Sequence, residues 1–149
     1  MTLHILLDSY PLGALSHPNP PDTSIFQWAA DCQAAGHEIH VPEVIDYEIR
    51  RELLRAGKNT GIRKLDGLKA MLNFLPINSA AMLLAADLWS QSRRSGLATG
   101  DPKRLDVDVI LAAQALTLGV PASELTVATS NVGHISRFVR ADLWTNIKP

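Results

Sequence analysis

The stretch His4-Ile5-Leu6-Leu7-Asp8 sets the pattern of the chain, because it is a short apolar run that ends abruptly at an acid. Such a run, bounded by polar residues, predicts a short buried strand. Comparable runs occur at residues 38–41 and 125–128, and longer stretches with helical periodicity separate them. This alternation is typical of βαβ units with a parallel sheet. We therefore expect an α/β fold, a three-layer α/β/α sandwich around a central, mostly parallel sheet of four or five strands.

The segments between these runs carry helix signals. Asp22 or Thr23 is a suitable cap for a helix that stops at Gly36, and Pro42 suits the first turn of a helix that reaches about residue 55. Pro76 confines any strand at residues 74–77 to an edge or an end of the sheet. Further helices are predicted over residues 60–72, 78–94 and 106–118, a loop over 95–102, and a last strand within 141–147.

The composition predicts one ordinary globular domain, which we expect to span residues 1–149. Hydrophobic residues make up 46% of the chain and charged residues 19%, unlike the balance of a disordered protein. The single cysteine, Cys32, cannot form an internal disulfide, and no apolar run reaches the roughly 18 residues of a membrane span. The first residues also lack the cationic region of a secretory signal. We therefore expect a cytoplasmic protein that does not associate with the membrane.

The overall charge does not favour nucleic-acid binding, so any such contact must rest on local patches. The net charge is −1, and the pI is near 6.5. A basic cluster contains Arg50, Arg51, Arg55, Lys58, Arg63 and Lys64, and a second one contains Arg93, Arg94, Lys103 and Arg104. Each cluster is a candidate for gripping a substrate, and each is equally well explained as a solvated surface.

Acidic residues occupy places where α/β proteins carry out chemistry. Asp8 directly follows the first strand, and open parallel sheets bind ligands at the carboxyl ends of their strands. Its alternative role is to cap a short helix over residues 10–15. Glu48 lies on the edge of the apolar stripe of the helix that begins near Pro42, where an exposed ion pair with Arg51 or Arg55 would explain it equally well.

Two more acids, Asp106 and Asp108, open the alanine-rich helix over residues 106–118. At about 100° per residue they point roughly 200° apart and cannot both face one ion. Asp108 shares a face with apolar residues, whereas Asp106 is better placed to cap the helix. Thr129 and Asn131 follow another strand, where they would serve either a site or a simple turn.

The joint order of these residues resembles the PIN-domain family. The matching pieces are residues 6–9, 41–53, 108–116 and 127–135. The resemblance implies a divalent-metal site, with Mg²⁺ or Mn²⁺ held by Asp8, Glu48 and Asp108. In the family the third acid directly precedes a run of the form Ala-Leu-Ile-Ala-Ala, so the match falls on Asp108. Asn131 is the implied fourth group, and Ser9, Asp106, Thr129 and His134 are secondary candidates.

One position departs from the family pattern. The family's last motif often carries a further acid three residues after its Thr-x-Asn, where this chain has His134. The number of metal ions is therefore open between one and two. The same departure favours a second interpretation, a PIN-like module that binds RNA or protein and has lost catalysis.

The resemblance implies an endoribonuclease that hydrolyses RNA phosphodiester bonds, like the toxin half of VapBC-type, type II toxin–antitoxin pairs. Asp8 and Asp108 would bind the metal, Glu48 would bind it directly or through the attacking water, and Asn131 would orient that water. It further implies a homodimer and a small antitoxin protein as partner. A flavodoxin-like or nucleotide-binding domain is disfavoured, because no Gly-rich phosphate loop follows the first strand.

Overall fold

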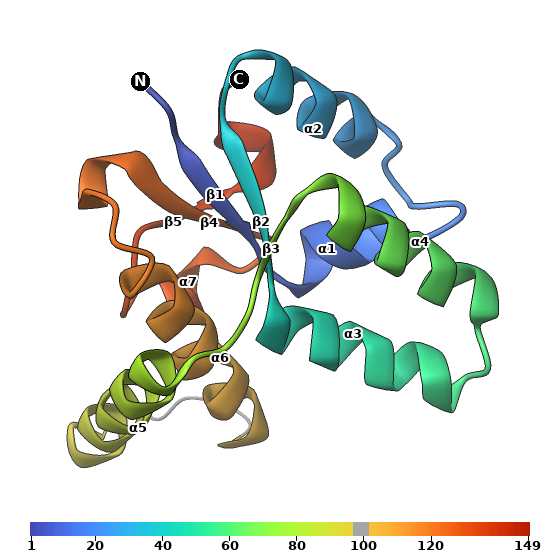
Figure 1. Cartoon of the computed structure of the whole chain (residues 1–149). Helices are drawn as coiled ribbons and strands as arrows, with labels where there is room; N and C mark the ends of the chain where they lie inside the picture. The colour runs from blue at the N-terminus through green and yellow to red at the C-terminus, as the bar shows by residue number, and fades with distance from the viewer. Residues whose placement is uncertain (97–101) are drawn as a thin grey trace.

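A five-stranded parallel sheet forms the centre of the computed structural model, which describes residues 1–96 and 102–149 (Figure 1). The strands lie in the order β3-β2-β1-β4-β5, and every pair of neighbours is parallel. Their bounds are β1 His4–Leu7, β2 Glu38–Pro42, β3 Asn73–Leu75, β4 Leu125–Thr129 and β5 Ala141–Leu143. The predicted α/β fold with a parallel sheet is confirmed. The strand near Pro76 is at an edge, as its proline requires.

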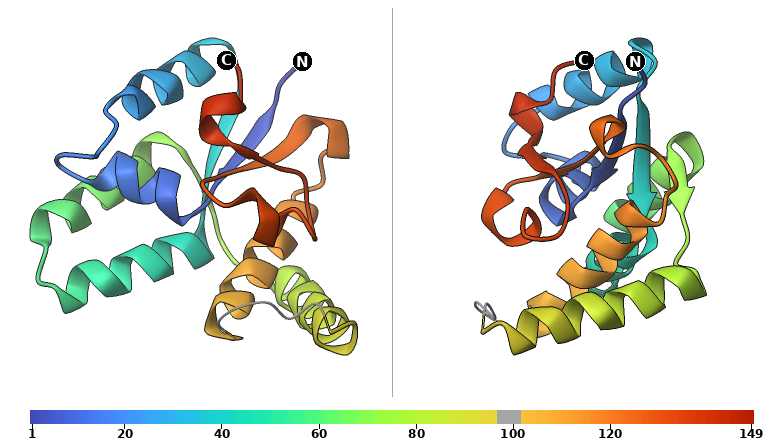
Figure 2. Two further views of the ribbon diagram at one scale, coloured as in Figure 1. Left: turned by 180° about the vertical axis from the view of Figure 1, so that it is seen from behind. Right: turned by 90° about the vertical axis from the view of Figure 1, so that its left-hand side faces the viewer.

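Helices cover both faces of the sheet, as Figures 1 and 2 show. Their bounds are α1 Ser9–Ser16, α2 Ser24–Ala34, α3 Glu43–Arg55, α4 Asn59–Met71, α5 Ser79–Arg94, α6 Pro102–Leu116 and α7 Val132–Ile135. Right-handed crossovers put α1, α2 and α4 on one face and α6 and α7 on the other. α5 packs on α6, and α3 contacts both α1 and α6. α3 therefore joins the two helical layers beside the carboxyl edge of the sheet.

The core centres on β1, the middle strand. Ile5, Leu6 and Leu7 have no solvent exposure. The C-terminal segment is attached to α2 through Trp28, whose Nε1–H donates to the carbonyl of Ile147 at 2.9 Å. Trp28 also packs edge-to-face on Trp144, with ring centroids 5.6 Å apart. Burial of these aromatic rings holds α2 and the C-terminal segment in one core.

Several predicted boundaries needed correction. α6 begins at Pro102, four residues before the predicted start at Asp106, so Asp106 lies inside the helix and is not its N-cap. Pro42 ends β2 and is the N-cap of α3. The last predicted strand is shorter than expected, because a 3-10 turn begins at Trp144. Of the predicted loop at 95–102, residues 97–101 lie outside the described part of the chain.

Membrane insertion has no candidate segment in the described ranges. Within residues 1–96 and 102–149, no helix has the length and apolar character needed to cross a bilayer.

A histidine pair joins the neighbouring strands β1 and β2, with His40 buried and His4 half-buried. Nδ1 of His4 lies 3.1 Å from Nε2 of His40, and the two rings stack with centroids 5.3 Å apart. The pKa of His40 is lowered to about 4, chiefly by burial and also by the proximity of His4, while Glu38 opposes the shift. His40 is therefore neutral in the folded protein at neutral pH.

The His4–His40 pair predicts that the folded protein loses stability in acid. Between pH 6.5 and about 4 the unfolded chain protonates His40 while the folded protein does not, so stability is lost as the pH falls through that window. The loss should be on the order of 3 kcal/mol, and His40→Gln should remove most of it. Urea unfolding of wild type and variant between neutral pH and about pH 4 measures the effect. The control is the exposed His17→Gln, and equal acid sensitivity in all three proteins would contradict the assignment.

Candidate functional site

The carboxyl ends of β1 and β4 bring Asp8 next to Thr129. The two strands pair in register, with Leu7 opposite Ala128, and the backbone N–H of Asp8 donates to the Ala128 carbonyl at 2.9 Å. The hydroxyl of Thr129 donates to Oδ2 of Asp8 at 2.8 Å. Because both groups are buried, this bond fixes the orientation of the carboxylate.

Asp8 is also the N-cap of α1. Its Oδ1 accepts hydrogen bonds from the backbone N–H of Ser9 at 2.7 Å and from the Ser9 hydroxyl at 3.2 Å. The capping role and a place in the candidate site are compatible, because Oδ1 both caps α1 and accepts from Nη2 of Arg104, while Oδ2 is held by Thr129. The predicted cap is confirmed, with α1 beginning at Ser9 rather than at Tyr10.

Glu48 reaches the same place from α3. Its side chain is 17% exposed, and the alternative that it pairs with Arg51 or Arg55 is wrong. Arg55 pairs with Glu52 instead, and the guanidinium of Arg51 lies over the ring of Tyr47. Both oxygens of Glu48 accept from Nη1 of Arg104, at 3.0 and 2.7 Å.

Asp108 and Asp106 lie on different faces of α6, as their spacing predicts. Asp108 is only 2% exposed, whereas Asp106 is on the solvent side. Oδ1 of Asp108 lies 3.2 Å from Nε of Arg104, one turn earlier on the same helix. The structure therefore brings Asp108, and not Asp106, to Asp8 and Glu48. We call Asp8, Glu48 and Asp108 the acid centre.

Arg104 lies in the middle of the acid centre. Its Nη2 is 3.1 Å from Asp8, its Nη1 is 2.7 Å from Glu48, and its Nε is 3.2 Å from Asp108. Nη1 also donates to the hydroxyl of Ser9 at 3.2 Å. Burial by itself lowers the pKa of Arg104, but the three carboxylates outweigh it and raise that pKa above its ordinary value. One guanidinium thus serves three acids from three elements.

The pKa of Asp108 reflects the burial and the charges of the acid centre. The pKa of the Asp108 carboxyl is raised to about 6, chiefly by burial; Arg104 opposes the rise and the nearby charge of Asp8 adds to it. His134 and Arg137 lower the same pKa to a smaller degree. The Arg104 cation therefore only partly compensates the cost of three acids in one place.

The remaining predicted residues lie around this centre. The backbone N–H of Asn131 donates to the hydroxyl of Thr129 at 3.0 Å, which is the predicted Ser/Thr turn. The Asn131 side chain is exposed, and among the described residues no hydrogen bond joins it to the acids. His134 is half-buried on α7, close enough to Asp108 to influence its carboxyl.

Two cationic residues gained roles that sequence reasoning did not assign. Arg104 was expected on a basic patch, although its spacing of four residues from Asp108 places both on one helical face. Arg137 was not considered, because its place near Asp108 depends on how α7 packs on α6. The side chain of Lys103, predicted in the same patch as Arg104, lies outside the described residues.

The donors suit a hard divalent cation by their chemistry, since Mg²⁺ and Mn²⁺ prefer carboxylate oxygens. The three carboxylates already surround one cation, the Arg104 guanidinium. With Arg104 in this place, no group of three acid, histidine or cysteine side chains in residues 1–96 and 102–149 is arranged to hold a metal ion. The acid centre therefore fits a divalent ion in donor type, and Arg104 occupies its middle.

Solved structures with the same arrangement of elements are known. VapBC2 from Rickettsia felis, bound to a DNA fragment from its promoter, matches with a TM-score of 0.73 and 16% identity, over 95% of this chain and 99% of that chain. VapBC-1 from nontypeable Haemophilus influenzae matches at 0.70 and 18%, over 97% and 100%. FitAB bound to the IR36 DNA fragment matches at 0.70 and 18%, over 97% and 98%. The chain has a PIN-domain fold. No family model and no curated protein matches the sequence.

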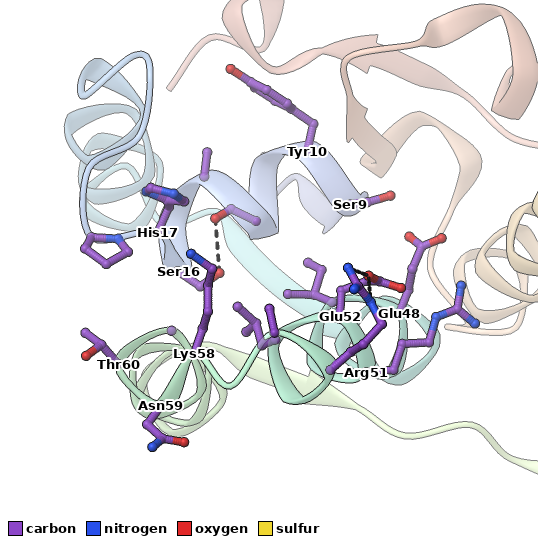
Figure 3. Close-up of a pocket in the computed structure, with 18 of the residues that line it drawn as sticks. Ser9, Tyr10, Ser16, His17, Glu48, Arg51, Glu52, Lys58, Asn59 and Thr60 are labelled. Atoms are coloured by element: carbon purple, nitrogen blue, oxygen red, sulfur yellow. Dashed lines mark hydrogen bonds and ion pairs between the residues drawn. The ribbon is translucent and has the colours of Figure 1, made fainter.

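Glu48 of the acid centre, together with Arg104, lines one end of a groove of about 1280 Å³ in this PIN-domain fold. Figure 3 shows α1 along one side and α3 with the start of α4 along the other, with Ser9 and Glu48 at one end and His17 and Thr60 at the other. Four cationic side chains line the groove: Arg51, Arg55, Lys58 and Arg104. Part of the first predicted basic cluster therefore lies along a path that leads to the acids.

Asp108 gives a stability test that needs no metal. Between pH 3.8 and about 6 the folded protein holds a proton on Asp108 that the unfolded chain has released, so stability falls as the pH rises through that window. In chelator at mildly alkaline pH, Asp108→Asn should therefore be about 1–3 kcal/mol more stable than wild type. The advantage should shrink towards pH 4. Chemical unfolding at both pH values measures it.

The matched control is Asp106→Asn on the exposed face of α6. It should change stability by less than about 1 kcal/mol, with little dependence on pH. An Asp108→Asn protein that is less stable than wild type at alkaline pH would show that the Arg104 contact outweighs burial and repulsion.

Proposed function

We propose that this protein is a metal-dependent ribonuclease that hydrolyses RNA phosphodiester bonds and is the toxin component of a type II toxin–antitoxin pair. One observation carries the proposal. Acids from three distant stretches of the chain, Asp8, Glu48 and Asp108, meet around a single cation at the carboxyl edge of the sheet. Carboxylate oxygens gathered in one pocket are the donor type that Mg²⁺ or Mn²⁺ prefers.

In this proposal Asp8 and Asp108 hold the metal, and Glu48 binds it directly or through the attacking water. When bound, such an ion acidifies and orients a water for attack on phosphorus. Thr129 keeps Asp8 in place through its hydroxyl. Asn131, fixed at the start of α7 by the same hydroxyl, orients the attacking water from the solvent side.

In this proposal the RNA substrate binds in the groove. A single strand of RNA carries one negative charge per nucleotide, so its backbone favours a path lined by cations. Lys58, Arg51 and Arg55 line the groove on the side of α3 and its turn into α4. Arg55 is already paired with Glu52. Within residues 1–96 and 102–149, neither Lys58 nor Arg51 forms an ion pair, so these two are the stronger candidates for phosphate contacts.

A non-catalytic RNA- or protein-binding module remains the second candidate. Arg104 in the middle of the acid centre favours it, because the acids are already partly neutralised without metal. His134, where the family's last motif often has an acid, points the same way. Cleavage assays on purified protein separate the two candidates.

The partners follow from the same proposal. The structural neighbours are VapBC and FitAB complexes, which supports a small antitoxin protein as the partner of this chain. We further propose a cytoplasmic homodimer. Co-expression with an adjacent small reading frame, followed by size-exclusion chromatography with light scattering, tests both the partner and the oligomeric state.

The choice of acid gives a direct test of catalysis. Asp108→Asn should lower Mn²⁺-dependent RNA cleavage by at least about 100-fold, because a metal-holding oxygen is lost, while Asp106→Asn on the opposite face should cut within about twofold of wild type. Cleavage of a fluorescent RNA in Mn²⁺, with chelator as the blank, measures both. Equal losses in the two variants would reject Asp108 as the metal ligand. A wild type that binds RNA without cutting it would support the non-catalytic candidate.

The groove makes a separate prediction about affinity. Lys58→Ala and Arg51→Ala should each weaken binding of a single-stranded RNA, and each should reduce the slope of log affinity against log salt by about 0.7. Arg94→Ala is the control, because Arg94 is equally exposed but lies on α5 and does not line the groove. Fluorescence anisotropy over a salt series measures the slopes. Identical slopes for all the proteins would place the RNA elsewhere.

A further inference from the structure

We propose that Arg104 is a built-in counter-cation of the acid centre and that it competes with the divalent ion for the same three carboxylates. The inference rests on the proposed function and adds a regulation to it. The observed metal affinity then depends on two equilibria: binding of the ion by the free acids, and release of the acids by Arg104.

The contacts show how completely Arg104 occupies the acids. Each of its three nitrogens serves a different carboxylate, Nη2 with Asp8, Nη1 with Glu48 and Nε with Asp108. Both carboxylate oxygens of Glu48 accept hydrogen bonds from Arg104. The second oxygen of Asp8 is held by Thr129. A metal ion that takes oxygens from all three acids must therefore replace bonds to Arg104.

The position of Arg104 on α6 supports a dedicated role. It is the third residue of a 15-residue helix, where the positive end of the helix dipole disfavours a cation. A solubilising arginine gains nothing at this place. The acids compensate the unfavourable dipole, since Arg104 is about two-thirds buried and faces three of them.

Charge counting gives the direction of the competition. Three ionised carboxylates carry −3, and Arg104 reduces this to −2. A divalent ion added without loss of Arg104 would have to share oxygens with a neighbouring cation in a partly buried pocket, which costs free energy. A divalent ion that replaces Arg104 leaves −1 and meets no neighbouring charge of its own sign. Arg104 therefore keeps the metal-free protein folded, and its release is part of metal binding.

The test is Mn²⁺ titration by calorimetry of wild type, Arg104→Gln and Arg104→Lys. If Arg104 holds the acids more than about nine-tenths of the time, its removal should tighten Mn²⁺ binding at least about tenfold. Arg104→Lys keeps the charge on one ammonium, which cannot bridge three carboxylates, so its affinity should lie between the other two. Thermal unfolding in chelator should show Arg104→Gln melting below wild type, and Mn²⁺ should reverse the order.

The matched control is Arg50→Gln on α3. Arg50 also bridges two carboxylates, those of Asp46 and Asp66, but outside the acid centre. Its loss should leave Mn²⁺ affinity within about twofold of wild type, because its partners Asp46 and Asp66 are not acids of the acid centre. A tenfold change in this control would mean that general loss of positive charge explains the result, and the inference would fail.

The outcomes separate this inference from the proposed function. If wild type binds Mn²⁺ and both Arg104 variants bind it equally or more weakly, the competition is refuted while the metal site stands. If none of the proteins binds Mn²⁺, both the metal site and the competition are refuted. Should Arg104→Gln fail to fold even with Mn²⁺, Arg104→Lys decides, because affinity at or below that of wild type refutes competition.

Discussion

The carboxyl edge of this protein depends on one electrostatic constraint, which is that three carboxylates cannot share a partly buried pocket without a cation. The constraint shows in Asp108, whose pKa rises to about 6 through burial first and the nearby charge of Asp8 second, despite an arginine 3.2 Å away. Arg104 meets the constraint in the absence of metal by contacting all three acids. Three helices meet at that point: Asp8 caps α1, α3 contributes Glu48, and α6 contributes both Asp108 and Arg104.

The fold explains why the charges meet. Parallel strands end at one edge of the sheet. Asp8, directly after β1, and Thr129, at the end of β4, are therefore neighbours although 121 positions separate them. α3 leaves β2 at the same edge and carries Glu48 inward on its second turn. α6 approaches from the other face of the sheet and meets α3 there. The site thus draws on both helical layers, which makes its geometry sensitive to how the layers pack.

Sequence patterns predicted what depends on local chemistry. The apolar runs located β1, β2 and β4 within a residue, and helical spacing separated Asp106 from Asp108 correctly. The patterns failed where a contact depends on how distant segments pack together. The start of α6 was misplaced because Asp106 is a good cap and Pro102 is an equally good first helical residue. The partner of Glu48 was missed because Arg104 lies 56 residues away, and no local rule favours it over an arginine three residues along.

The acids themselves bear on the choice between a nuclease and a binding module. A module that only binds RNA gains nothing from three acids beside its groove, because they repel the phosphates that Lys58 and Arg51 would attract. They also destabilise the folded protein, since the raised pKa of Asp108 measures a free energy that folding must supply at neutral pH. Perturbed groups of this kind concentrate where chemistry needs them. A cluster that is costly for folding and unfavourable for anion binding needs a cation to balance it. Arg104 supplies that cation in the structure, and under the proposed function a divalent ion would take its place.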